Sequence, residues 1–159
     1  MRILGIDPGT GILGFGIIEV KNNELSEIID AGVIASPKHT PLPDRLLDIY
    51  NSLNEIIKKN RPDVMAIEKL FFARNITTAI SVAEARGVVE LVAKQNNIQI
   101  AEYTPLQIKQ TLTGYGRAEK KQVQEMVKKE LKLKEIPKPD DCADALAAAI
   151  THSFVNKIV

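Results

Sequence analysis

The N-terminal stretch from Arg2 to Gly11 constrains the fold of this chain more than any other part of the sequence. A short apolar run ends in one carboxylate, Asp7, a turn rich in Gly and Pro follows, and a second apolar run covers residues 12–20. Apolar runs bounded by turn residues predict β-strands, so the two runs predict a hairpin within a sheet. An acid at the end of a buried strand is costly unless a cation or a hydrogen-bond network compensates it. The alternative is that Asp7 only caps the turn.

The next residues predict an α/β protein. Residues 28–35 form a third apolar run, which would complete an antiparallel meander with the first two. Residues 44–60 carry apolar side chains at three- and four-residue spacing and predict a helix. The run at residues 63–68 ends in Glu68, and because a helix precedes it, we expect a strand parallel to the first. Asp7 and Glu68 would then meet at the carboxyl ends of neighbouring strands, where α/β sheets usually bind ligands.

The second half of the chain alternates further helical patterns with one more strand. We expect helices at residues 75–96, 105–112, 118–133 and 140–156, and a strand at residues 98–103. In the first of these helices, Ile80, Val88, Leu91 and Val92 would lie on one side, and small side chains would allow close packing against a helix or a second subunit. The elements together predict a five-stranded mixed sheet flanked by helices, in a single domain spanning residues 1–159.

Two further acids, Asp141 and Asp144, share one face near the start of the last expected helix. Helix N-termini favour acids, which accounts for Asp141 more easily than for Asp144 among its apolar neighbours. No basic residue in the sequence is obviously placed to pair with Asp144. Carboxylates gathered without bases repel one another unless cations bind, and Mg²⁺ or Mn²⁺ prefers such oxygen ligands. Two such ions can activate a water and stabilise the leaving oxygen in phosphodiester cleavage.

Charge and aromatic residues point to an anionic partner. Residues 1–68 hold 7 basic and 10 acidic side chains, whereas residues 107–138 hold 9 basic and 4 acidic ones. Such a basic block suits nucleic acid, although a solvated helix face is the simpler alternative. Phe71 and Phe72 closely follow Glu68, and either one could stack on bases or belong to the core. Carboxylates, a basic block and an aromatic pair together indicate a nuclease.

Other features bear on the compartment and on metal chemistry. One cysteine, Cys142, allows no internal disulfide and fits a reducing cytoplasm. The two histidines, His39 and His152, lie far apart without cysteine neighbours, which argues against the usual zinc site. No apolar run approaches the roughly 20 residues that span a bilayer, and the N-terminus lacks a signal-peptide layout. We therefore expect a cytoplasmic protein without a membrane partner.

The sequence resembles the RuvC family of Holliday junction resolvases along essentially its whole length. The matching stretches, in order, are ILGIDPGT with the following GFGII, then MAIEKLFF, EARGVV, TPLQIKQTLTGYGRAEKKQV and DDCADALAAAITH. The resemblance implies a ribonuclease H-like fold and a homodimer that binds four-way DNA junctions and nicks two opposing strands symmetrically. It also implies a role in DNA recombination and repair, with a branch-migration motor of the RuvA and RuvB type as a partner.

The functional positions of the family pattern have matching residues in this sequence. The residues that match its metal ligands are Asp7, Glu68, Asp141 and Asp144. They would hold Mg²⁺, two ions per site, with Mn²⁺ as a substitute. Phe71 matches the stacking aromatic in position, and Lys109 and Lys120 match the DNA-contacting lysines. Leu13 and Glu84 depart from the pattern, where Thr and Gln are usual; the first could alter contacts near the metals, and the second adds negative charge near DNA or the subunit interface.

Two other classes of protein compete with this interpretation. A sugar-kinase or actin-like protein would use the DPGTG turn on nucleotide phosphates, but it would need a second phosphate loop and a larger two-domain body. A non-catalytic DNA-binding module would keep the fold, and the intact set of four acids argues against it. We therefore expect a metal-dependent, structure-selective endonuclease that leaves 5′-phosphate and 3′-hydroxyl ends.

Overall fold

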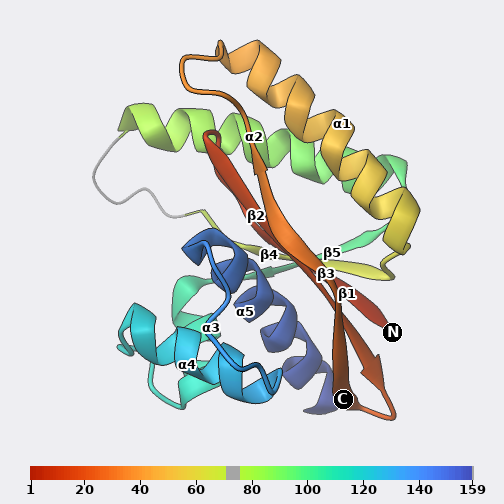
Figure 1. The fold of residues 1–159 in the computed structure, drawn as a ribbon, viewed down its shortest axis with the longest axis vertical. Helices are drawn as coiled ribbons and strands as arrows, with labels where there is room; N and C mark the ends of the chain where they lie inside the picture. Colours follow the sequence, from red (N-terminus) through yellow and green to blue (C-terminus); the bar gives the residue numbers. More distant parts are fainter. Residues whose placement is uncertain (71–75, 159) are drawn as a thin grey trace.

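The structure, a computed structural model that describes residues 1–70 and 76–158, is built on one mixed sheet (Figure 1). Its strands are β1 (Arg2–Asp7), β2 (Ile12–Lys21), β3 (Glu24–Ala35), β4 (Val64–Glu68) and β5 (Gln99–Tyr103). The spatial order is β3-β2-β1-β4-β5; β1 to β3 form an antiparallel meander, and β4 and β5 run parallel to β1. The five-stranded mixed sheet is therefore confirmed, as is the parallel strand that ends in Glu68.

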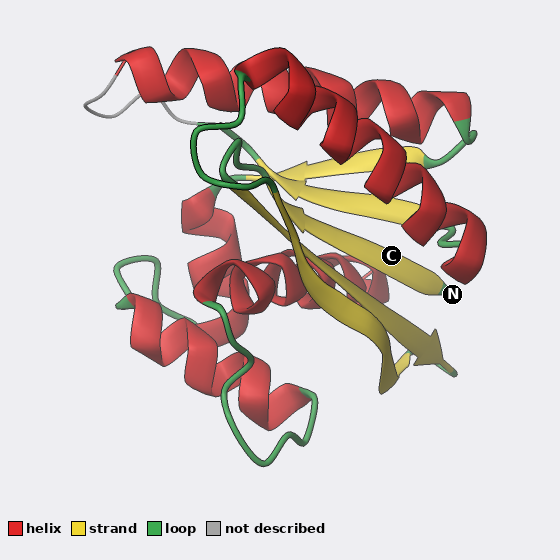
Figure 2. Cartoon of the chain, turned by 45° about the horizontal axis from the view of Figure 1, so that its top comes forward, coloured by secondary structure: helices red, strands yellow, loops and turns green. Residues whose placement is uncertain are grey.

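Helices cover both faces of the sheet (Figure 2). They are α1 (Leu42–Asn60), α2 (Ile76–Gln95), α3 (Pro105–Thr113), α4 (Lys120–Glu130) and α5 (Asp140–Val155), followed by a 3₁₀ turn at Asn156–Ile158. One core joins α1 and α2 to side chains such as Ile6, and the other joins α3, α4 and α5 to side chains such as Ile18. Within the described ranges, none of the helices combines the length and hydropathy that a bilayer span requires.

Two elements differ in extent from the sequence prediction. Strand β3 begins at Glu24, four residues before the apolar run, because its pairing with β2 continues through polar positions down to the hairpin turn. The helix expected at residues 118–133 is shorter and ends at Glu130. Lys132 adopts a left-handed backbone conformation (φ 53°), and the N–H of Leu133 bonds back to the carbonyl of Lys128. This left-handed residue ends the helix before Leu133, the last residue of the predicted helix.

Two glycines of the sheet set how closely α5 can approach. A Cβ atom at Gly5 in β1 would overlap the carbonyl oxygen of Ala145, and one at Gly14 in β2 would overlap that of Asp141. The backbone of α5 therefore lies against the strands only because both positions lack a side chain. Gly14 pairs with Asp7 across the β1–β2 ladder, so this contact brings the start of α5 beside Asp7.

Replacing Gly14 by Ala should test this contact. We expect Gly14→Ala to lower the free energy of unfolding by about 3 kcal/mol, because a backbone carbonyl cannot move aside as a flexible side chain can. Gly11→Ala is the matched control: its nearest neighbour would be a guanidinium nitrogen of Arg45 at 3.8 Å, and we expect a change within about 0.5 kcal/mol. Denaturant unfolding of both variants measures the difference, and equal stabilities would contradict the packing described for α5.

Candidate active site

Four carboxylates meet at one edge of the sheet, and we call Asp7, Glu68, Asp141 and Asp144 the acidic edge. Asp7 is the last residue of β1 and Glu68 the last of β4, and these strands are parallel neighbours. Asp141 and Asp144 lie at the start of α5. The structure thus brings together all four acids that the sequence singled out, each half-buried.

Burial and mutual repulsion dominate the electrostatics of the acidic edge. Burial, followed by the charges of Asp144, Glu68 and Asp141, raises the pKa of Asp7 from 3.8 to about 8. Burial and the charge of Asp144 also raise the pKa of Glu68, although Lys109 and Lys120 act against this. At neutral pH the metal-free site therefore holds a proton on Asp7, because ionising it would add a further negative charge to a half-buried cluster.

Lys120, at the start of α4, partly neutralises this cluster. Its ammonium nitrogen lies 3.0 Å from Oδ2 of Asp144 and 3.4 Å from Oδ2 of Asp140. Burial would lower the pKa of Lys120, but the hydrogen bond and charge of Asp144 outweigh it and raise that pKa. The pKa of Asp144 is raised by burial even so, with Lys120 acting against the rise. The sequence showed no obvious base for Asp144, whereas in the structure Lys120 pairs with it, because α4 packs against α5.

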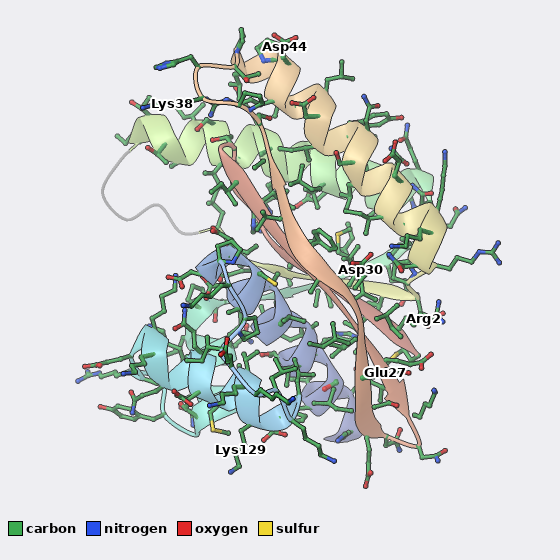
Figure 3. The ribbon with its side chains drawn as sticks, in the orientation of Figure 1. Arg2, Glu27, Asp30, Lys38, Asp44 and Lys129 are labelled. Carbon is green, nitrogen blue, oxygen red and sulfur yellow. The ribbon has the colours of Figure 1, made fainter. Side chains whose placement is uncertain are left out.

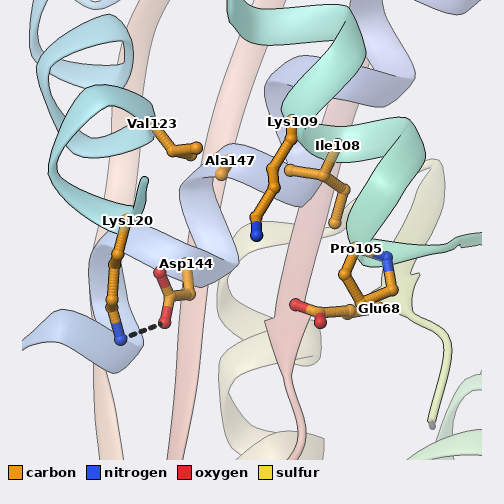
Figure 4. Close-up of a pocket in the computed structure, with 8 residues that line it drawn as sticks. All are labelled: Glu68, Pro105, Ile108, Lys109, Lys120, Val123, Asp144 and Ala147. Carbon is orange, nitrogen blue, oxygen red and sulfur yellow. Dashed lines mark ion pairs between the residues drawn. The ribbon is translucent and has the colours of Figure 1, made fainter. Parts of the chain in front are cut away.

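A pocket of about 240 Å³ opens beside the acidic edge (Figure 4). Glu68 and Asp144 point into it together with Lys109 from α3 and Lys120 from α4. Its apolar wall consists of Pro105, Ile108, Val123 and Ala147. The sequence did not single out this wall, because its residues come from three helices that meet only in the fold. Both lysines thus lie beside the carboxylates, and an anionic phosphate group could replace the carboxylates that pair with Lys120.

The acidic edge fits hard divalent cations by the chemistry of its donors. All four donors are carboxylates, and their mutual repulsion is what a cation would relieve. Among residues 1–70 and 76–158, however, no three Asp, Glu, His or Cys side chains converge closely enough to hold one ion. This arrangement suits Mg²⁺, which usually takes one or two carboxylates and completes its shell with water and substrate phosphate oxygens. It does not suit an ion that needs a closed cage of protein ligands.

The other residues that the sequence singled out lie outside the acidic edge or outside the described residues. Phe71 and Phe72 lie outside the described residues. Leu13 is fully buried in the core beneath α1 and α2, and Glu84 is exposed on α2. Sequence reasoning missed Arg86 of α2, which is buried and donates a hydrogen bond to the main-chain oxygen of Glu68. The only available signal was its place in the EARGVV stretch.

Two surfaces away from the acidic edge carry features relevant to binding. Helix α4 and the following loop present exposed lysines, among them Lys129, which points into solvent in Figure 3. On α2, Ile76, Ile80 and Leu91 are 75%, 53% and 52% exposed, whereas Val92 is fully buried. The prediction that Ile80, Leu91 and Val92 share one side was therefore wrong. Helix α2 has a buried face towards the sheet and a separate exposed apolar stripe, because the small side chains between the two faces leave the apolar pattern ambiguous.

A family model, curated relatives and a solved structure that resemble this chain all carry the same family name. The family model described as crossover junction endodeoxyribonuclease RuvC matches residues 3–152. The chain is 56% identical to a protein of that name from Caldicellulosiruptor saccharolyticus, covering 100% of this chain and 96% of the relative. It is also 56% identical to one from Fusobacterium nucleatum, covering 96% of this chain and 80% of the relative. The structure of Thermus thermophilus RuvC in complex with Holliday junction substrate superposes with a TM-score of 0.93 at 36% identity, covering 99% of this chain and 96% of that one. The ribonuclease H-like fold expected from the sequence is thereby confirmed.

The raised pKa of Asp7 predicts how stability varies with pH when no metal is present. In the unfolded chain Asp7 ionises near pH 3.8, whereas in the folded protein it does so near pH 8. The stability that protonated Asp7 contributes to the free energy of unfolding is therefore fully present below pH 4. It decreases as the pH rises between these two pKa values and is lost above pH 8. Each unit of a raised pKa corresponds to about 1.4 kcal/mol, so even half of this rise amounts to a few kcal/mol.

Asp7→Asn should therefore raise the melting temperature of the chelator-treated protein at pH 8 by at least about 4 °C. At pH 4 the difference from the unaltered protein should be small. Asp44→Asn, at an exposed aspartate in the first turn of α1, serves as the control and should change little at either pH. Melting curves of the three proteins between pH 4 and pH 9 provide the measurement. A pH-independent difference for Asp7→Asn would contradict the proposed repulsion.

Proposed function

The chain belongs to the RuvC family of crossover junction endodeoxyribonucleases, and we propose that its acidic edge is where it hydrolyses the strands of a four-way DNA junction. It is thus a nuclease of DNA recombination and repair that resolves Holliday junctions. The observation that carries the site assignment is the gathering of four half-buried carboxylates at one edge of the sheet, where burial and then the charges of the other three acids raise the pKa of Asp7 to about 8. Such strongly perturbed carboxylates in a cleft mark functional sites more often than structural ones.

Nucleases of this family depend on divalent metal ions, and we propose Mg²⁺ as the ion, two per site, with Mn²⁺ able to substitute. Asp7, Glu68, Asp141 and Asp144 would hold the ions through their carboxylate oxygens. The bound ions would supply activation of a water and charge stabilisation at the leaving oxygen, giving 5′-phosphate and 3′-hydroxyl ends. Because Asp7 is protonated at neutral pH without metal, cation binding would displace its proton.

The lysines beside the acidic edge would orient the DNA backbone. Lys120 is held by Asp144 and Asp140, so an arriving phosphate would take over a partner that is already in place. Lys109 points into the same pocket from α3. Both would be placed at the scissile phosphate by the helices that carry them, rather than by loops. Phe71 remains a proposal from the family pattern as a side chain that stacks on the junction bases.

We propose that the protein acts as a homodimer through the exposed apolar stripe of α2. A junction with two equivalent scissile strands is best matched by two sites related by a twofold axis. Ile76, Ile80 and Leu91 are large apolar side chains left exposed on one helix, and Gly87 beside them has open space around it. A second copy of α2 packed there would remove this apolar area from water.

We further propose that residues 1–159 form one nuclease domain that works in the cytoplasm. Its partners there would be junction DNA and a branch-migration motor of the RuvA and RuvB type. The buried, unpaired Cys142 is compatible with a reducing compartment.

Asp7→Asn should abolish cleavage and leave DNA binding intact. The substrate is a labelled four-way junction with a mobile homologous core, which presents many sequences at the crossover, beside a matched linear duplex. We expect paired, ligatable nicks on the junction alone with Mg²⁺ or Mn²⁺, and none with chelator. The cleavage rate of Asp7→Asn should fall by more than about 100-fold, because losing a metal ligand should cost more than losing a group that only orients a ligand, while Asp44→Asn cuts normally. Nicking by Asp7→Asn at the unaltered rate would refute the assignment of the acidic edge.

Ile80→Glu should convert the dimer into a monomer without unfolding the chain. A carboxylate at the centre of an apolar contact would lose hydration on association, which opposes it strongly. Leu47→Glu is the matched control, since Leu47 is a large apolar residue on α1 that is 56% exposed. Sedimentation velocity measures both variants. A dimer that persists in Ile80→Glu would place the subunit interface elsewhere.

A further inference from the structure

The buried Arg86 of α2 contacts the main chain at the acidic edge. Arg86 is 9% exposed, and its Nη1 donates to the main-chain oxygen of Glu68 at 2.6 Å. Its Nε donates to Glu90 at 2.8 Å and its Nη2 to Glu102 of β5 at 2.5 Å. One guanidinium therefore joins a helix, the end of β4 and β5. The two carboxylate partners are 43% and 47% exposed, so these ion pairs alone contribute little to stability.

The bond to Glu68 matters because of where β4 ends. Pairing between β1 and β4 extends to Ile6 opposite Ile67, one residue before Glu68. Pro8, beyond the end of β1, has no N–H with which to continue that ladder. A carbonyl left unpaired there would be costly in this half-buried position, and Arg86 supplies the missing donor from α2.

The peptide unit between Glu68 and Lys69 is held at both of its polar atoms. Its oxygen accepts from Arg86, and its N–H, which belongs to Lys69, donates to the main-chain oxygen of Tyr103 at 2.7 Å. With both atoms fixed, the plane of this peptide cannot rotate, and the direction in which Glu68 leaves the backbone is set. Arginine suits this task because its planar guanidinium presents several donors in fixed directions and stays charged.

We propose that Arg86 is a positioning residue for Glu68, one that aims the carboxylate through the peptide that follows it. The proposal rests on the function assigned above to Glu68. Displacing a catalytic group by about 1 Å can cost about 100-fold in rate, so a fixed peptide here has a direct consequence for cleavage. The competing explanation is that Arg86 only ties α2 to β5 through Glu102.

The two explanations differ in what each variant should do. Arg86→Met removes every interaction of the guanidinium, whereas Glu102→Gln removes the charge pairing to β5 and keeps the bond to Glu68. Arg86→Lys keeps a cation for Glu90 and Glu102 but lacks the planar set of donors that also reaches the carbonyl. Glu90→Gln is the matched control, because it changes a partner on α2 itself. Glu68→Gln reports separately whether Glu68 is needed at all.

The experiment compares single-turnover cleavage of the mobile-core junction, junction affinity in chelator, Mn²⁺ affinity by calorimetry, and melting temperature. For Arg86→Met we expect cleavage and Mn²⁺ affinity to fall about 10- to 100-fold, with junction affinity within about threefold of the unaltered protein. Arg86→Lys should lose at least about tenfold in rate, and Glu90→Gln and Glu102→Gln should stay within about threefold.

Two results would overturn the positioning role: cleavage by folded Arg86→Met at the unaltered rate, or an equal loss in Glu102→Gln. If Arg86→Met does not fold, Arg86→Lys decides, and a normal rate in that variant overturns the proposal. A normal rate in Glu68→Gln would instead refute the assigned function of Glu68, so the two failures are distinguishable.

Discussion

The contact between the backbone of α5 and the central strands is the constraint on which the rest of the molecule depends. Gly5 and Gly14 leave no side chain between strand and helix, so α5 lies closer to the sheet than ordinary packing would allow. That closeness carries Asp141 and Asp144 to the edge where β1 and β4 end. A layer of ordinary side chains would hold the helix farther away, and the strand acids and the helix acids would no longer interact strongly.

The close approach of α5 to the sheet also makes the metal-free protein less stable, because it brings carboxylates together that repel one another. Burial and the neighbouring carboxylates raise the pKa values of Asp7, Glu68 and Asp144, and Asp7 keeps its proton at neutral pH as a result. Lys120 relieves part of this repulsion through Asp144, but its side chain is 56% exposed, so the pair is accessible to solvent and to an incoming anion. The site is thus partly neutralised by groups that a cation and a phosphate can displace, which is how an arrangement unfavourable by itself becomes suitable for binding both.

Much of this arrangement could be predicted from local sequence, and the remainder could not. The strand that ends in Glu68, its parallel crossover and the helix that begins at Pro105 follow from short-range patterns, and all are present. The partner of Asp144 could not be foreseen, because Lys120 is brought to it by the path of the chain between α4 and α5. Arg86 was missed for a related reason: its partner at the acidic edge is a backbone oxygen, which leaves no trace in side-chain composition.

Helix α2 connects the two halves of the proposed mechanism. One face carries Arg86 towards the peptide that follows Glu68, and another exposes the apolar stripe that includes Ile80 and Leu91. If that stripe joins two copies of the chain, the same rigid element sets both the separation of the two sites and the aim of one carboxylate in each. Paired cuts on opposing strands require both properties at once. A helix meets this requirement better than a loop would, because its hydrogen-bonded backbone fixes the relation between the two faces.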